Sequence, residues 1–586
     1  MTLQLKDGFE CLYLSHVSFR DLTLFFIPFN YTVFLSSQIN HIKIMRAYFT
    51  LSFLCLLLYL PGIASLPIVD RDSPHFAQAS LQMVESKNYV QINFQDKPRH
   101  LKPPGIYWLH AIVLKIAGNQ YLRSIWAYRI PGVIGALLAV LFTYAFAKSF
   151  YSVREAWYAA SILACSLFLV IETRLIITDT VLLLTMVLMQ GALWKMYTQP
   201  KQSVLNNWRW PLLFWFAMAL GVLIKGLTPL IAGLTIIGLS IFDKDRTWLK
   251  NLKFSWGLPL LIVLTLAWLI PVSVVANSNL LFDMVGRDLF PKIASGQESH
   301  GMPPGYFITT LPLMFWPVSL FIWHGLIFGI QNRCQRVEKF LLIWIGSVLL
   351  FYEIIVTKLP QYILPIYPAI AILAAIGVSK LDWQTLLKSW RIWLRTYSVL
   401  WLLYSAALIA GVLFYFFFYQ LGIRSFWLYF VSVLMIIGNL SAFILFNRKE
   451  WFRALNVLLI TAILVYAPIW QFILPQAKPL WLSQQVYEQL QKNNELSAIS
   501  EQRPLLAVGY EEPSLVFLIG TKKVVFSSIE QAAKSLYTYN GEIVLIAEPE
   551  WIELNKDIKI QTKPIAIIKG FNLGNGTWTT LYLLHA

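Results

Sequence analysis

The stretch SIWAYRIPGVIGALLAVLFTYAFA, residues 124–147, decides the fold, because about 20 mostly apolar residues in a row are what a helix needs to cross a membrane. Lys225 and Gly226 divide another apolar run, 209–242, into two short segments. The sequence predicts a polytopic α-helical membrane protein with thirteen spans: 47–67, 124–147, 154–173, 178–197, 209–224, 227–242, 255–275, 313–330, 339–356, 361–379, 397–418, 425–446 and 454–474.

The composition excludes the other broad classes of protein. Charged residues make up 13% of the chain and hydrophobic residues 57%, with a mean hydropathy of +0.60. Soluble domains carry about 25% charged residues, so an ordinary soluble globule, a disordered chain and a collagen-like chain are ruled out. The four cysteines form no CxxC pair, and none lies in 475–586, which excludes a disulfide scaffold and a thiolate zinc site.

The net charge of +17 fits a membrane orientation better than binding to nucleic acid. If the N-terminus is cytoplasmic, the loops after the even-numbered spans carry nineteen Lys and Arg residues, whereas the short loops on the other side carry mainly Lys225, Lys358 and Arg424. Cytoplasmic loops are enriched in Lys and Arg. The segments 68–123, 276–312 and 475–586 are therefore predicted to face outward.

Three domains are predicted. Residues 22–37 are apolar but short for a span, and a better spanning segment begins just after Met45-Arg46. We therefore interpret 1–44 as an extension before a native start at Met45. A native N-terminal extension, or a signal-peptide core at 47–60, are the alternatives. The membrane domain follows over 45–474, and 475–586 forms a small extracytoplasmic domain.

The outward segments have their own secondary structure. Within 68–123, apolar residues recur at helical spacing around 76–84 and 107–116, which predicts two interfacial helices, the second just after Pro103-Pro104. The C-terminal stretches PLLAVGY, SLVFLIG, KKVVFS and EIVLIAE are typical of short buried strands, with a helix near 528–537. This pattern predicts a small α/β domain.

Several charged residues lie in or beside the outward membrane face, where charge is costly and marks candidate functional sites. Carboxylates and lysines together suit a reaction with an anionic leaving group. The candidates are Asp70, Arg71, Asp72, Lys102, Asp179, Lys225, Glu298, His300, Lys358 and Tyr362.

Each candidate also has a structural interpretation. Asp72 could cap the helix of 73–86, Asp179 could pair with Arg174, and Lys225 could be an ordinary charge at a loop end. Lys102 and Lys358 could be snorkelling anchors. The pair formed by Glu298 and His300 is a weak metal pattern, and a solvated loop is its alternative.

Five motifs, in order along the chain, carry a resemblance. They are IVDRDSPHFAQA (68–79), LKPPGIYWLHA (101–111), TRLIITDT (173–180), GQESHGMPPGYF (296–307) and KLPQYILPIYPAIAIL (358–373). Over about 45–475 the chain resembles the GT-C glycosyltransferases of the protein O-mannosyltransferase and aminoarabinose transferase superfamily. The resemblance implies a polyprenyl-phosphate sugar as donor and an active site on the extracytoplasmic face.

The resemblance also implies roles for individual residues. Asp72 matches the family's catalytic acid, with Asp70 as a second candidate because Ser73 stands where the family has another acid. Beyond the resemblance, we predict that Asp179 orients the sugar or stabilises oxocarbenium charge on it. Lys102, Lys225 and Tyr362 are assigned to the donor phosphate. His300 matches a loop histidine of the family.

The same resemblance raises the question of a divalent metal. The aminoarabinose enzymes have a glutamate ligand directly before the lysine, where this chain has Leu101. Glu298 is the candidate replacement ligand, together with His300. No other cofactor is implied.

Together these features predict an inverting glycosyltransferase in the bacterial inner membrane, with its site on the periplasmic face. The implied acceptor is a lipid or glycolipid, most naturally lipid A or lipopolysaccharide core. Protein O-mannosylation is one alternative. A polytopic transporter or lipid flippase is another, although such a protein would place its charges near the midplane in two repeated halves.

Overall fold

The computed structural model describes residues 22–99, 102–198, 208–276, 301–418, 426–538, 542–557 and 563–585. The chain divides into two compact units, 1–50 and 51–586. The outward segments, most of the predicted spans and the C-terminal domain lie within the second unit.

Eight described helices are long and apolar enough to cross a membrane, or nine if one bent pair counts as a single span. The bent pair joins Tyr306–Met314 to Val318–Gln331 at an angle of 120°. Apart from the bent pair, the helices are α1 (Leu22–Tyr59, spanning from His41), α4 (Ile125–Lys148), α7 (Asp179–Thr198), α10 (Phe254–Ala276), α16 (Tyr367–Lys380, with the 3₁₀ turn Pro360–Ile366), α17 (Lys388–Phe418), α18 (Phe426–Asn447) and α19 (Trp451–Pro468).

The other predicted spans are also helical but shorter, broken or more charged. Gly226 ends α8 with φ +59°, a conformation that suits glycine, so the expected break after Lys225 is present. These helices do not meet the length and apolarity test singly, so the number thirteen stays a prediction. They are α5 (Val153–Cys165), α6 (Leu167–Glu172), α8 (Arg209–Lys225), α9 (Ala232–Phe242), α14 (Ile322–Gln331) and α15 (Arg336–Ile354). The helix α13 (Tyr306–Met314) lies almost entirely in the segment 276–312 that was predicted to face outward.

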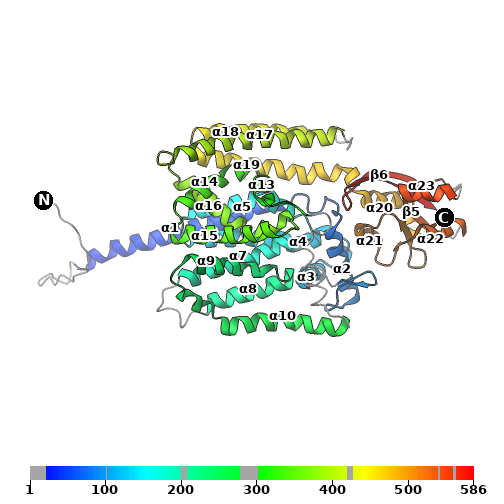
Figure 1. Cartoon of the computed structure of the whole chain (residues 1–586), viewed down its shortest axis with the longest axis horizontal. Coiled ribbons are helices and arrows are strands. Elements are labelled where there is room, and N and C mark those ends of the chain that lie inside the picture. Colours follow the sequence, from blue (N-terminus) through cyan, green and yellow to red (C-terminus); the bar gives the residue numbers. More distant parts are fainter. Residues whose placement is uncertain are drawn as a thin grey trace. The chain divides into compact units, whose positions relative to one another are not determined.

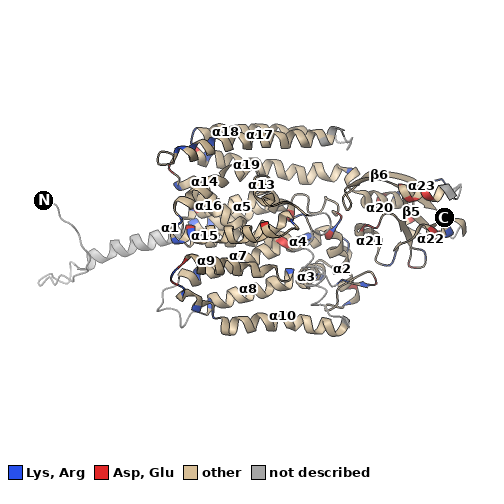
Figure 2. Ribbon diagram, viewed as in Figure 1, with Lys and Arg blue, Asp and Glu red and all other residues tan. Residues whose placement is uncertain are grey.

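Charge divides the helix bundle into two ends. Figure 2 shows Lys and Arg gathered at one end of the long helices. There, Lys339 Nζ lies 2.7 Å from Asp243 Oδ1, and the Tyr151 hydroxyl donates to Glu338 Oε1 at 2.7 Å. These contacts join three loops that the charge pattern assigned to the same side of the membrane.

The segment 68–99 and 102–123 contains the two expected helices, α2 (Asp72–Ser86) and α3 (Gly105–Ala117). A short hairpin of β1 (Asn93–Phe94) and β2 (Lys97–Pro98) lies between them in the chain. Both helices pack against each other, and α3 packs on α4 and α8. The first outward segment is therefore part of the helical body.

The C-terminal domain is built on a five-stranded mixed sheet of order β4-β3-β5-β7-β6. Figure 1 shows β5 and β6 of this sheet with the helices α20, α21, α22 and α23. The predicted helix near 528–537 is present, whereas SLVFLIG is helical and its assignment as a strand is wrong. Pro513 begins this helix, as proline often does at the first helical turn. The elements are α20 (Leu482–Lys492), β3 (Leu505–Val508), α21 (Pro513–Ile519), β4 (Val524–Phe526), α22 (Ile529–Thr538), β5 (Ile543–Ala547), α23 (Glu548–Asp557), β6 (Ala566–Asn572) and β7 (Thr577–His585).

Candidate active site

A cavity of about 350 Å³ lies where α2, α7, α8, α10 and α15 approach one another. Most of its lining is apolar. Five of the eight residues that the sequence analysis assigned to the site line this one cavity: Asp72, Lys102, Asp179, Lys225 and Tyr362.

Asp72 is the first residue of α2, and its side chain is exposed. Arg71, directly before it, has φ +86° and ψ −118°, a conformation that non-glycine residues rarely adopt. Such backbone strain persists where the surrounding structure imposes it, often at functional sites. The turn at Arg71 brings Asp72 to the cavity, while the following residues of α2 are buried.

Asp179 and Lys225 form an ion pair inside the cavity wall. Lys225 Nζ lies 2.5 Å from Asp179 Oδ1, and the two side chains are 15% and 5% exposed. Asp179 is the first residue of α7 and Lys225 the last of α8, so each charge is favourable for its helix dipole. Lys225 Nζ also lies 5.9 Å from the ring centroid of Tyr362. A cation, a carboxylate and a phenol hydroxyl therefore share one side of the cavity.

The close approach of α3 to α8 explains how Lys102 reaches the same cavity. At Gly105, a Cβ atom would lie 2.6 Å from the Leu223 carbonyl oxygen and 2.8 Å from Ile224 Cδ1. Only glycine permits this contact without displacement of the backbone. Lys102, three residues earlier, thus lines the cavity with Lys225.

Glu172 is an acidic residue beside the site that the sequence analysis missed. It ends α6, is 2% exposed, and interacts electrostatically with both Asp179 and Lys225. Its Oε2 has no hydrogen-bond partner among the described residues. In the sequence, Glu172 could have been found as a carboxylate inside the predicted span 154–173.

Asp70 does not line the cavity. Burial, reinforced by the negative charge of Glu512, raises the pKa of the Asp70 carboxyl to about 7, and hydrogen bonding to Ser514 opposes the shift. Asp70 therefore faces the C-terminal domain. Lys358 is also outside the cavity lining: it is 3% exposed, and its Nζ donates to the Ile355 carbonyl at 2.5 Å.

The metal candidates Glu298 and His300 lie outside the described residues. Within the described ranges, no group of three or more His, Cys, Asp or Glu side chains is placed to hold a metal ion. In this sequence, Leu101 stands where the resemblance implies a glutamate ligand. A divalent metal at Glu298 and His300 therefore stays a prediction.

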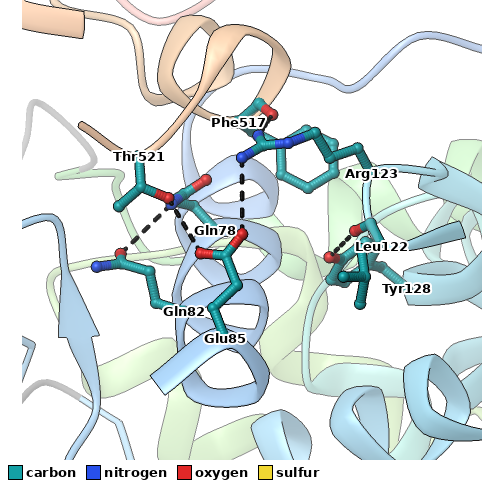
Figure 3. A network of polar contacts seen from close by, with 8 residues as sticks. All are labelled: Gln78, Gln82, Glu85, Leu122, Arg123, Tyr128, Phe517 and Thr521. Atoms are coloured by element: carbon teal, nitrogen blue, oxygen red, sulfur yellow. Dashed lines mark hydrogen bonds and ion pairs between the residues drawn. The ribbon is translucent and has the colours of Figure 1, made fainter. Parts of the chain in front are cut away.

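The C-terminal domain contacts α2 along its length. Figure 3 shows Gln78 Nε2 donating to Thr521 Oγ1, and Arg123 between Glu85 of α2 and the Phe517 carbonyl of α21. The Gln78–Thr521 distance is 2.8 Å. At the other end of the helix, Arg71 Nε donates to the Gly574 carbonyl at 3.3 Å. The helix that begins with Asp72 is therefore held by the C-terminal domain, although that domain supplies no lining residue of the cavity.

Comparison with known proteins agrees with this fold. Residues 101–273 match the family described as dolichyl-phosphate-mannose-protein mannosyltransferase. The chain is 25% identical over 328 residues to undecaprenyl phosphate-alpha-4-amino-4-deoxy-L-arabinose arabinosyl transferase 2 of Proteus mirabilis (strain HI4320), covering 54% of this chain and 57% of that one. It is 22% identical over 323 residues to an uncharacterised protein of Aquifex aeolicus (strain VF5), covering 55% and 61%.

The structural similarity extends over nearly the whole chain. The crystal structure of ArnT from Cupriavidus metallidurans bound to undecaprenyl phosphate matches with a TM-score of 0.69 and 17% identity, covering 92% of this chain and 97% of that one. Its apo form matches with a TM-score of 0.68 and 18% identity, covering 90% and 96%. By sequence, the chain spans 57–61% of the length of the two relatives above.

The fold and the cavity define a multi-span membrane protein of the architecture seen in ArnT. In sequence, the chain is similar over about half of its length to undecaprenyl phosphate-alpha-4-amino-4-deoxy-L-arabinose arabinosyl transferases, in agreement with the resemblance carried by the sequence motifs.

Proposed function

We propose that the protein transfers one sugar from a polyprenyl-phosphate donor to an extracytoplasmic acceptor, with inversion at the anomeric carbon. The observation that carries this proposal is the single cavity that joins two carboxylates, two lysines and a tyrosine within a mostly apolar lining. The relatives named for an undecaprenyl phosphate sugar support the choice of donor.

The donor phosphate binds to Lys102, Lys225 and Tyr362. Negative charge grows on the phosphate oxygen as the bond to the sugar breaks, so cations placed there stabilise the transition state more than the ground state. Apolar side chains beside them, such as Leu223, Leu227 and Leu269, provide a surface for the first prenyl units.

Asp72 acts as the base. It takes the proton from the acceptor hydroxyl as the new bond between acceptor oxygen and anomeric carbon forms, and the bond from that carbon to the phosphate oxygen breaks. Asp179 is paired with Lys225, so it is better suited to orient the sugar or to balance positive charge on it. If the acceptor is a phosphate, Asp72 orients it instead. A base contributes about 10²–10⁴-fold, which leaves much of the rate to stabilisation of the phosphate.

The orientation of the site follows from charge. The basic loops at the opposite end of the bundle belong to the cytoplasmic side under the positive-inside rule, so the cavity opens at the periplasmic side of the inner membrane. Lipid A or lipopolysaccharide core is the proposed acceptor. Protein O-mannosylation is the second candidate, favoured by the family match over 101–273.

Mass spectrometry of a deletion strain tests the proposal. Loss of one defined sugar from lipid A, restored by the wild-type gene but not by Asp72→Asn, would support it. Unchanged lipid A with loss of a sugar from secreted proteins would favour the second candidate. A strain that retains all its glycans but accumulates a lipid on one face of the membrane would show a transporter instead.

A further inference from the structure

The segment between α6 and α7 is tied to the first residues of α2. The Ile176 backbone N–H donates to Ser73 Oγ at 3.1 Å, and the two residues are 1% and 5% exposed. Ser73 directly follows Asp72, and Ile176 lies three residues before Asp179. One buried hydrogen bond therefore joins the neighbourhoods of the two carboxylates.

Arg174 anchors the same segment at its start. Its guanidinium is 1% exposed, and Nη2 donates to the carbonyl oxygens of Leu58, at 2.5 Å, and Pro61, at 3.0 Å. Nη1 donates to Val170 O and Thr173 Oγ1, both at 2.7 Å. Arg174 thus binds the end of α6 to the carbonyls that the end of α1 leaves without helical partners.

Arg129 binds the next part of the loop that follows α1. It is 1% exposed, and its guanidinium donates to carbonyl oxygens only: Gly62 at 3.4 Å, Ile63 at 2.9 Å, Leu66 at 2.7 Å and Pro67 at 2.9 Å. A buried charge costs free energy unless its hydrogen bonds are made. Two buried arginines bound to one short loop therefore fix the path that leads to Asp72.

We propose that Ser73 and Arg174 are positioning residues that set the separation between Asp72 and the Asp179–Lys225 pair. Ser73 stands where the superfamily motif has a second acid, and here it serves as a hydrogen-bond acceptor. This role rests on the proposed function, because it presumes that both carboxylates act on one substrate.

Ser73→Ala tests the role with a small change. It removes the acceptor of the Ile176 N–H and replaces none of the cavity-lining side chains. Displacement of a reacting group by about 1 Å can cost about 10²-fold in rate, so we expect the maximal rate to fall about tenfold or more. The half-saturating donor concentration should change less than twofold, because the phosphate-binding residues lie on other elements. Ser73→Thr keeps the hydroxyl and should restore most of the rate.

Ser80→Ala is the matched control. Ser80 lies on the same helix and is 0% exposed; its Oγ donates to the Phe76 carbonyl at 2.7 Å and lies 2.9 Å from His110 Nδ1. Ser80→Ala removes hydrogen bonds comparable to the one lost in Ser73→Ala, but Ser80 does not contact the segment that carries Asp179. Its maximal rate should stay within twofold of wild type, even if its melting temperature falls as much as that of Ser73→Ala.

The rate is measured as polyprenyl phosphate released from a polyprenyl-phosphate-sugar extract of the source cells. Hydrogen exchange of a peptide covering 174–179 is measured on the same purified variants without substrate. Faster exchange in Ser73→Ala but not in Ser80→Ala, with the tenfold loss of rate, would establish the role. Equal rates in the two variants, or unchanged exchange, would overturn it. An inert wild type with the exchange difference present would instead count against the proposed function.

Discussion

Lys225 pairs with Asp179 and, in the proposed mechanism, binds the donor phosphate. Replacement of Lys225 by methionine separates the effects of these two roles. Lys225→Met keeps the apolar stem but leaves the Asp179 carboxylate, 5% exposed, without its cation at 2.5 Å. Breaking one partner of a buried ion pair costs about 3–5 kcal/mol, because a buried charge remains unpaired. The melting temperature in detergent should therefore fall clearly.

Turnover should fall for a different reason. Loss of one donor to a developing negative charge costs about 10²–10³ in kcat, and we expect that loss to exceed any rise in the donor KM. The double change Lys225→Met with Asp179→Asn removes the unpaired charge. It should regain most of the stability but none of the turnover.

Lys358→Met is the control for this experiment. Lys358 is also buried, at 3% exposed, but does not line the cavity. Its kcat should stay within twofold of wild type. If Lys225→Met keeps wild-type kcat and loses only membrane insertion, Lys225 is a snorkelling anchor and the donor phosphate binds elsewhere.

Four further predictions follow from the same geometry. Asp72→Asn should abolish transfer in a folded protein while Asp70→Asn retains most of it; equal losses would reverse the assignment. A reporter fused after residue 475 should be active outside the cytoplasm, and cytoplasmic activity would mean that the spans were miscounted. In the folded protein the pKa of Asp70 is raised from an ordinary 3.8 to about 7. The contribution of Asp70 to the free energy of unfolding should therefore be fully present below about pH 4 and be lost as the pH rises through 7. Melting temperatures measured from pH 5 to 8 should therefore fall less in Asp70→Asn than in wild type, and parallel curves would contradict this. EDTA should leave turnover within twofold, since Leu101 replaces a ligand; abolished turnover restored by a divalent ion would show a metal site at Glu298 and His300.

The cavity could be predicted because charge at a membrane face is expensive and therefore informative. Asp72, Lys102, Asp179, Lys225 and Tyr362 are far apart in sequence, yet the spans return each of them to one end of the bundle. Under the positive-inside rule, that end is expected to be the periplasmic one.

Other features could not be read from one sequence. Whether SLVFLIG is a strand or a helix is not decided by hydrophobicity, because a short buried run looks the same in both. The orientation of Asp70 toward Glu512 depends on how the C-terminal domain packs on α2. Glu172 lies inside an apolar span, and its approach to Asp179 and Lys225 depends on how α6, α7 and α8 pack.

The most direct test of the central claim is the release of polyprenyl phosphate by the purified protein. Incubation with a polyprenyl-phosphate-sugar extract and a lipid A acceptor should yield free polyprenyl phosphate and glycosylated acceptor in equal amounts. Asp72→Asn should yield neither while keeping the wild-type melting temperature. Wild-type protein that releases no polyprenyl phosphate from any sugar donor in the extract, in the presence of either lipid or protein acceptors, would contradict the account.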